Sequence, residues 1–165
     1  MLLPDAELLL TQLTEQMRPR VNAASTALLG IHTGGVWLAE RLHANLQLTL
    51  PVGAIDVSFY RDDYRQRGLH GNARSSQIPY DVDGAQVIIV DDVLYTGRTI
   101  RAAINELFDY GRPARVDLAV LVDRGGRELP ITPNYCAHSL QLSAAQMLAL
   151  ERAEDAKLSF RLVEK

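Results

Sequence analysis

The chain has 165 residues, of which 47% are hydrophobic and 22% charged, and a formal net charge of −3 at pH 7, which together predict one α/β domain over residues 1–165. No apolar run approaches the length of a membrane span, and the single cysteine, Cys136, excludes an internal disulfide and suits a reducing compartment. We therefore expect a cytoplasmic protein that does not interact with membranes.

Helices and strands are expected to alternate along the chain. Leu9, Leu13 and Met17 form one apolar stripe, which predicts a helix over residues 5–17. Further helices are expected over 36–46 and 100–107, and strands over 26–31, 54–60, 87–90, 116–122 and 158–162. Residues 61–76 are read as a loop, whereas 144–153 fit either a helix or a strand. This alternation indicates an open, mainly parallel sheet flanked by helices, with ligands beyond the carboxyl ends of its strands.

The most informative segment is VIIVDDVLYTGRT, residues 87–99. Its apolar start reads as a buried central strand, and Asp91 and Asp92 follow at the end of that strand. The turn over residues 95–99 offers backbone N–H groups, hydroxyls and one guanidinium at the start of a helix, which suits a phosphate. The two carboxylates suit sugar hydroxyls or a divalent cation. Together these features predict a site for a ribose 5-phosphate.

Other predicted strand ends carry polar or glycine-rich residues. Thr33-Gly34-Gly35 would let backbone amides approach an anion such as pyrophosphate, although a plain strand-to-helix turn explains these residues equally well. Arg61 begins the predicted loop, and Asp123-Arg124 follows the later buried strand. Among 17 basic residues only Lys157 and Lys165 are lysines, and no P-loop motif exists, which excludes a Walker-type NTPase. We therefore expect arginine, backbone amides or a metal to hold any bound phosphate.

The segment around the acidic pair resembles the signature of the phosphoribosyltransferases. The resemblance extends to the PyrR family of pyrimidine operon regulators and uracil phosphoribosyltransferases. It is carried, in chain order, by Gly30-Ile31-x-Thr33-x-Gly35, Tyr60-Arg61-Asp62-Asp63, Val90-Asp91-Asp92-Val93-Leu94-Tyr95-Thr96-Gly97-Arg98-Thr99, Gly111-Arg112-Pro113 and Ala119-Val120-Leu121-Val122-Asp123-Arg124-Gly125-x-Arg127-Glu128-Leu129-Pro130-Ile131.

This resemblance implies a type I phosphoribosyltransferase fold with a small hood formed by the chain ends. The implied reaction joins uracil to phosphoribosyl pyrophosphate, giving UMP and pyrophosphate, with Mg²⁺ as cofactor. The family resemblance also implies dimers or larger assemblies, and binding to pyrimidine operon leader RNA under nucleotide control.

The same resemblance assigns roles to individual residues. It implies that Asp91, Asp92 and Arg61 are catalytic, and that the two aspartates hold Mg²⁺ mostly through water or substrate. It further implies three subsites: a phosphoribosyl subsite of Asp91, Asp92, Tyr95, Thr96, Gly97, Arg98 and Thr99, a pyrophosphate subsite of Thr33, Gly34, Gly35 and Arg61, and a base side of Asp123 and Arg124.

The chain departs from the family pattern at several places. The first loop of the family commonly reads Thr-Arg-Gly, whereas this chain has Gly34 in the middle, so a site that binds nucleotide with little or no catalysis is an alternative. Gln12, Glu15 and Gly126 stand where the RNA face of the family carries basic residues. Three readings stay open: a uracil phosphoribosyltransferase, a nucleotide-sensing regulator that binds RNA or a protein partner, and a phosphoribosyltransferase for purines or other bases.

Overall fold

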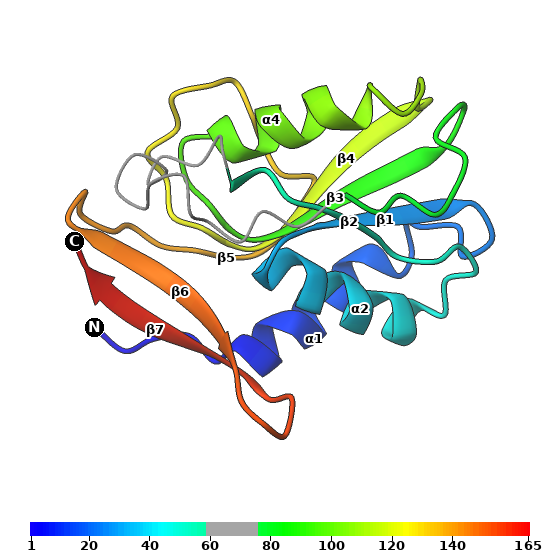
Figure 1. Cartoon of the computed structure of the whole chain (residues 1–165). Coiled ribbons are helices and arrows are strands. Elements are labelled where there is room, and N and C mark those ends of the chain that lie inside the picture. Colours follow the sequence, from blue (N-terminus) through cyan, green and yellow to red (C-terminus); the bar gives the residue numbers. More distant parts are fainter. Residues whose placement is uncertain (59–75) are drawn as a thin grey trace.

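Five parallel strands form the central sheet of the computed structural model, which describes residues 1–58 and 76–165. Their order is β2-β1-β3-β4-β5 (Figure 1), so β3 is the central strand and β2 and β5 are the edge strands. The strands are β1 (Thr26–Ile31), β2 (Gly53–Ile55), β3 (Gln86–Leu94), β4 (Arg115–Asp123) and β5 (Tyr135–Ser139).

Helices cover both faces of this sheet. Figure 1 shows α1 (Ala6–Met17) and α2 (Gly34–Leu46) on one face and α4 (Arg98–Leu107) on the other. Leu28 of β1 belongs to the apolar core under α1 and α2, whereas its neighbour Leu29 belongs to the core under α4. Because successive side chains point to opposite faces, a strand buried on both faces has no polar alternation, as the sequence of β1 predicts.

A hairpin of two antiparallel strands, β6 (Gln146–Arg152) and β7 (Leu158–Glu164), forms the hood. One carboxylate ties this hairpin to both helices of the neighbouring face. Glu7 of α1 accepts a hydrogen bond from the backbone N–H of Leu158 at 2.8 Å and forms an ion pair with Arg41 of α2 at 2.7 Å. Hydrogen bonds from Arg41 and Leu158 lower the pKa of Glu7, although burial opposes this shift.

The predicted elements agree with the structure over most of their length. The predicted strand 26–31 is confirmed, and the predicted helix 5–17 begins at Ala6 because the carboxylate of Asp5 caps it. The predicted strand 54–60 is wrong in length, since β2 covers only Gly53–Ile55. The carboxylate of Asp56 accepts the N–H of Ser58 at 2.9 Å, and this turn ends the extended backbone.

The second half of the chain holds a strand that the sequence pattern did not predict. β5 pairs with β4 at the edge of the sheet, and His138 and Ser139 at its end are exposed. The segment 144–153, which fitted a helix or a strand, contains β6. The predicted loop 61–76 lies outside the described residues except for Ser76.

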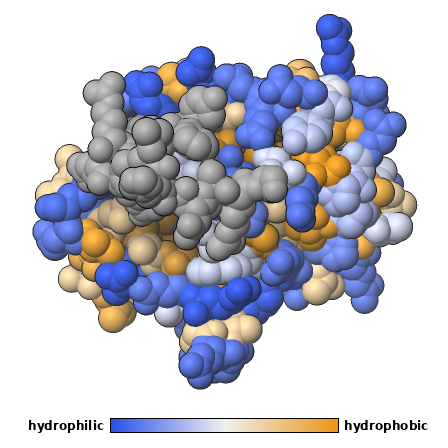
Figure 2. Space-filling view, viewed as in Figure 1, coloured by the Kyte–Doolittle hydropathy of each residue, from blue (hydrophilic) through white to orange (hydrophobic). Residues whose placement is uncertain are grey.

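The described helices include none long and apolar enough to cross a membrane. On the face shown in Figure 2, hydrophilic side chains predominate among the coloured residues, with apolar ones in small groups between them.

Candidate active site

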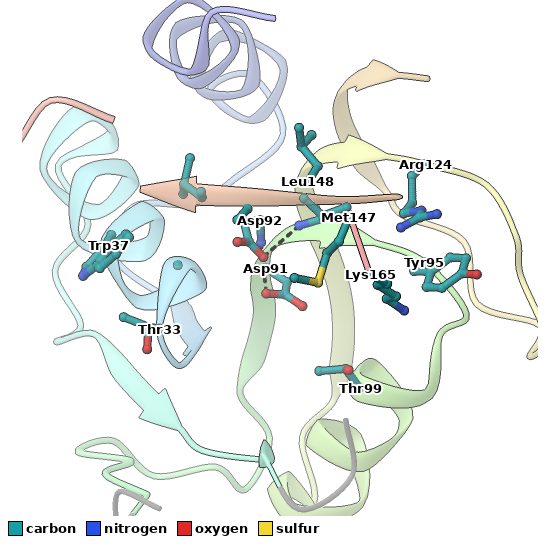
Figure 3. A pocket seen from close by; sticks show the side chains of 14 residues that line it. Thr33, Trp37, Asp91, Asp92, Tyr95, Thr99, Arg124, Met147, Leu148 and Lys165 are labelled. Atoms are coloured by element: carbon teal, nitrogen blue, oxygen red, sulfur yellow. Dashed lines mark hydrogen bonds between the residues drawn. The ribbon is translucent and has the colours of Figure 1, made fainter. Parts of the chain in front are cut away.

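A pocket of about 260 Å³ opens beyond the carboxyl ends of β1 and β3 (Figure 3). Its walls come from the start of α2, from the end of β3 with the turn into α4, and from the hairpin β6–β7. This location agrees with the expectation that ligands of an open parallel sheet lie at the carboxyl ends of its strands.

Asp91 and Asp92 lie in the middle of the pocket, in the second half of β3, which ends at Leu94 (Figure 3). Asp91 is only 4% exposed, whereas Asp92 is partly exposed. Each carboxylate accepts one backbone N–H of the following residue, Asp91 from Asp92 at 3.0 Å and Asp92 from Val93 at 2.9 Å. These bonds fix the orientation of both carboxylates and leave acceptor capacity for sugar hydroxyls or a cation.

The turn between β3 and α4 forms the start of a helix without a side-chain cap. Gly97 is the N-cap residue, with a φ of 93° that glycine adopts readily, and its position offers no side chain to bond the first amides. The hydroxyl of Thr96 accepts the N–H of Arg98 at 3.2 Å, and Thr99 lines the pocket. The remaining first-turn amides and the positive end of the helix dipole suit a phosphate.

A second helix start lies on the opposite side of the acidic pair. Thr33 is the N-cap residue of α2 and also makes no side-chain cap, and Gly34 lines the pocket beside it. The peptide bond between His32 and Thr33 is cis. A Cβ atom on Gly34 would lie 2.6 Å from Oδ2 of Asp92, and one on Gly35 would overlap the carbonyl oxygen of Val90. Both glycines therefore allow the helix start to approach the end of β3 closely.

Arg124 closes the pocket on the side of the hood. Its side chain is 4% exposed, and its two terminal nitrogens donate to the carbonyls of Gln146 at 2.7 Å and Ser143 at 2.9 Å. The guanidinium carbon lies 3.9 Å from the ring centre of Tyr95, which is a cation–π stack. Its Nε is buried and has no hydrogen-bond partner within the described part of the chain. This N–H is therefore a buried donor, without a partner, on a residue that lines the pocket.

Arg127 joins the base-side turn to the phosphate turn. It donates to the carbonyl of Tyr95 at 2.7 Å and to the carbonyl of Ile131 at 2.7 Å, and it forms an ion pair with Asp123 at 2.6 Å. Burial raises the pKa of Asp123, but the hydrogen bonds from Arg127 and from the N–H of Gly125 outweigh it, so the pKa lies below its usual value. Asp123 therefore holds the turn as an ionised carboxylate.

The structure brings most of the predicted site residues together. Thr33, Gly34, Asp91, Asp92, Tyr95, Thr99 and Arg124 line the pocket, and Gly35, Thr96 and Gly97 lie directly behind these residues in the two helix starts. Asp123 is bound to Arg127 rather than facing the pocket. Arg98 is half-exposed and pairs with Glu128 through two nitrogens at 2.9 Å. Arg61 lies outside the described residues, so its predicted role remains a prediction.

Several lining residues were missing from the predicted site. They are Trp37 on α2, Val93 on β3 and, from the hood and the residue after it, Met147, Leu148, Ala149, Leu150 and Lys165. The sequence offered only weak signals for them, a lone tryptophan after the glycine turn and one of two lysines. The apolar hood residues form a wall opposite the acidic pair, which suits the face of a flat base and excludes water.

Residues 3–141 match the family described as phosphoribosyl transferase domain. The chain is similar to the bifunctional protein PyrR of Pseudomonas entomophila, with 46% identity over 96% of this chain and 99% of the relative. It is also similar to the bifunctional protein PyrR of Ralstonia nicotianae, with 49% identity over 90% of this chain and 86% of the relative.

Solved structures show the same fold. A hypoxanthine phosphoribosyltransferase from Staphylococcus aureus aligns with a TM-score of 0.64 and 19% identity, covering 86% of this chain and 78% of the other. A purine phosphoribosyltransferase from Pyrococcus horikoshii aligns with a TM-score of 0.61 and 26% identity, covering 82% of this chain and 83% of the other. The structural likeness therefore supports the type I phosphoribosyltransferase architecture.

Proposed function

Because this chain belongs to the phosphoribosyltransferase family and, within it, to the PyrR proteins, we propose that it transfers the phosphoribosyl group to uracil and regulates pyrimidine biosynthesis genes. The reaction forms a bond between a uracil nitrogen and the anomeric carbon of phosphoribosyl pyrophosphate. The bond from that carbon to the pyrophosphate oxygen breaks, and UMP, pyrophosphate and the proton from uracil are released.

One observation carries the proposal: two uncapped helix starts flank an acidic pair in one pocket. The start of α4 suits the 5-phosphate, the start of α2 suits the pyrophosphate, and Asp91 and Asp92 lie between them. Each helix start offers positive potential to one phosphate group, and the acidic pair between them offers acceptors to the ribose hydroxyls. A ribose with a phosphate on C5 and a pyrophosphate on C1 therefore fits this arrangement. Neither a dinucleotide nor a simple sugar phosphate would use all three parts.

The residues act mainly by positioning and by charge. In the transition state the ribose ring develops positive charge at the anomeric carbon, and the carboxylates of Asp91 and Asp92 stabilise it electrostatically. The amides of Thr33, Gly34 and Gly35, with Arg61, take the leaving pyrophosphate. The first-turn amides of α4 hold the 5-phosphate throughout the reaction, so the ring stays aligned with the base.

The site suits Mg²⁺ as a cofactor shared with the substrate. Among the described residues no group of three His, Cys, Asp or Glu side chains is arranged to hold a metal alone. Mg²⁺ typically takes one or two carboxylates together with substrate phosphates and water, and the pair Asp91 and Asp92 can supply the carboxylates. When bound, the ion would neutralise charge on the pyrophosphate, while the carboxylates orient the ribose hydroxyls.

The base side suits a flat ring with carbonyl groups, bound under the hood. Leu148 and Leu150 offer apolar contact, and a small rotation of Arg124 would expose its unpaired, buried Nε as a donor to a ring carbonyl such as those of uracil. The test is a panel of bases with phosphoribosyl pyrophosphate and Mg²⁺, read as pyrophosphate release. Release with uracil and not with hypoxanthine, guanine or orotate supports the proposal. Pyrophosphate release with a purine and not with uracil would contradict the proposal and identify a purine phosphoribosyltransferase instead.

The regulatory role is proposed from the PyrR relatives, and it includes a cytoplasmic setting and assembly into dimers or larger oligomers. It predicts that UMP increases the affinity of the protein for pyrimidine operon leader RNA, and that this affinity falls steeply as salt rises. Light scattering after size exclusion measures the assembly. RNA binding whose affinity changes with neither UMP nor salt would contradict the regulatory role and would leave the transferase proposal unaffected.

A further inference from the structure

The charged side chains that line the pocket indicate which cation is available for the 5-phosphate. Among the described lining residues, Asp91 and Asp92 carry two negative charges, and Arg124 and Lys165 carry two positive ones. A phosphate monoester brings roughly 1.5 to 2 further negative charges at neutral pH. Without Lys165 the described lining would be net negative before the phosphate enters. With Lys165 the charges of these four side chains sum to zero, so Lys165 removes the net negative charge that would otherwise oppose a phosphate.

Other cations nearby already have partners. The guanidinium of Arg98 belongs to the phosphate turn but pairs with the carboxylate of Glu128 at 2.9 Å, and it does not line the pocket. Arg124 donates to two carbonyls and stacks on Tyr95. Within the described part of the chain, the side chain of Lys165 lines the pocket and has no hydrogen bond or ion pair. It is the cation left available for a ligand.

The hood fixes where Lys165 begins. Its backbone N–H donates to the carbonyl of Ala145 at 2.7 Å, and the preceding Glu164 pairs in register with Gln146. The carbonyl of Gln146 in turn accepts from Arg124, so the end of β7 is tied to the base-side turn. Figure 3 draws Lys165 beside Tyr95 and on the side of the pocket where Thr99 lies, away from Thr33 and Trp37. This is the side of the phosphate turn rather than of the pyrophosphate.

We propose that Lys165 binds the 5-phosphate of the phosphoribosyl group, together with the amides at the start of α4. The inference rests on the proposed function, because it takes a ribose 5-phosphate as the ligand. It adds a lysine to the arginine, backbone amides and metal that the sequence led us to expect around a phosphate. The sequence offered little signal for Lys165, because pairing within the hairpin brings this residue, distant in sequence, to the pocket that Tyr95 and Thr99 line.

The first test uses the fact that the chain has only two lysines. Lys157 lies in the turn at the other end of the hairpin and serves as an internal control. The whole protein is labelled with an amine-reactive reagent alone, with UMP, with ribose 5-phosphate and with uridine, and labelling is read by peptide mass spectrometry. UMP and ribose 5-phosphate should protect Lys165 and leave Lys157 unchanged, whereas uridine should protect neither. Equal labelling of Lys165 with bound UMP and without it would overturn the assignment.

A pair of variants gives an independent measurement. Lys165→Met should weaken UMP binding about tenfold at low salt, the effect of losing one hydrogen bond to a charged group, and leave uridine binding unchanged. Lys165→Arg should restore most of the affinity, and Lys157→Met should match the unmodified protein. Equal UMP affinity in both methionine variants would overturn the role of Lys165. Failure of the unmodified protein to bind UMP would instead overturn the proposed function, and this assignment with it.

Discussion

The glycines after Arg124 provide a matched pair for testing how the base side is built. Gly125 and Gly126 both have left-handed backbone angles, with φ of 72° and 79°. A Cβ atom on Gly125 would lie 3.1 Å from the flexible end of Gln141. One on Gly126 would lie 3.0 Å from Cδ2 of Tyr95 and closer still to Cε2. Alanine at either position therefore carries the same backbone cost, but only Gly126→Ala pushes the ring of Tyr95 away from Arg124.

The magnitude follows from these two terms. A left-handed backbone costs an alanine about 1 to 2 kcal/mol, so Gly125→Ala should lose roughly that much free energy of unfolding. Gly126→Ala should lose about 1 kcal/mol more, because the cation–π stack between Arg124 and Tyr95 contributes about 0.5 to 2 kcal/mol when it is shielded from water. Urea unfolding at one temperature measures both losses, provided that the slopes of the two transitions agree.

Binding adds the decisive comparison between the two variants. Gly126→Ala should weaken UMP binding, since Tyr95 and Arg124 line the pocket, whereas Gly125→Ala should bind UMP like the unmodified protein. Equal losses of stability in both variants, with equal UMP affinity, would contradict a role of the stack between Tyr95 and Arg124 in shaping the base side. In that case the ring of Tyr95 would have room to move without cost, and the stack would not shape the site.

Three further predictions concern the hood, the sheet edge and the acidic pair. Glu7→Gln should lose about 1 to 2 kcal/mol of unfolding free energy at neutral pH, because it weakens the contact to Arg41. Since the pKa of Glu7 is lowered in the folded protein, the difference in unfolding free energy from the unmodified protein should shrink as pH falls below 4.5. A difference that does not change with pH would contradict the pairing of Glu7 with Arg41. Gln16→Ala should lower the free energy of unfolding by about 1 to 2 kcal/mol, measured by heat or urea. The side-chain amide of Gln16 donates to the carbonyl of Cys136 and accepts the N–H of Cys136 at the edge of the sheet. An unchanged unfolding midpoint would contradict this contribution. Asp92→Asn should lower the rate of uracil transfer at least tenfold, about 1.4 kcal/mol of transition-state stabilisation, and unchanged turnover would remove the role assigned to this carboxylate.

Local patterns were enough to predict the centre of the site. The strand that carries Asp91 and Asp92, the turn at residues 95–99 and the start of α2 each depend on neighbours in sequence, so they could be predicted from residue order. The edge strand β5 could not, because its half-exposed residues lack the apolar run that marks a buried strand. Its existence follows from pairing with β4, which is a long-range contact.

The partners of the charged side chains also could not be predicted from the sequence pattern. The guanidinium of Arg98, in the predicted phosphate turn, pairs with Glu128, which lies thirty residues later in the chain. Lys165 reaches the pocket only because the hairpin folds over the sheet, and nothing in its local sequence indicates this. The loss of a side chain at Gly34 was read as a missing contact, whereas the structure adds that a Cβ there would meet Asp92 at 2.6 Å. Steric limits of this kind depend on three-dimensional proximity.

The most direct test of the central claim is the conversion of labelled uracil to UMP by the purified chain with phosphoribosyl pyrophosphate and Mg²⁺. We predict UMP and pyrophosphate in equal amounts, with loss of both on removal of Mg²⁺ and a fall of at least tenfold in Asp92→Asn. Binding of phosphoribosyl pyrophosphate without any UMP formed would contradict this prediction. That result would identify a nucleotide sensor that has the substrate pocket without the transfer reaction.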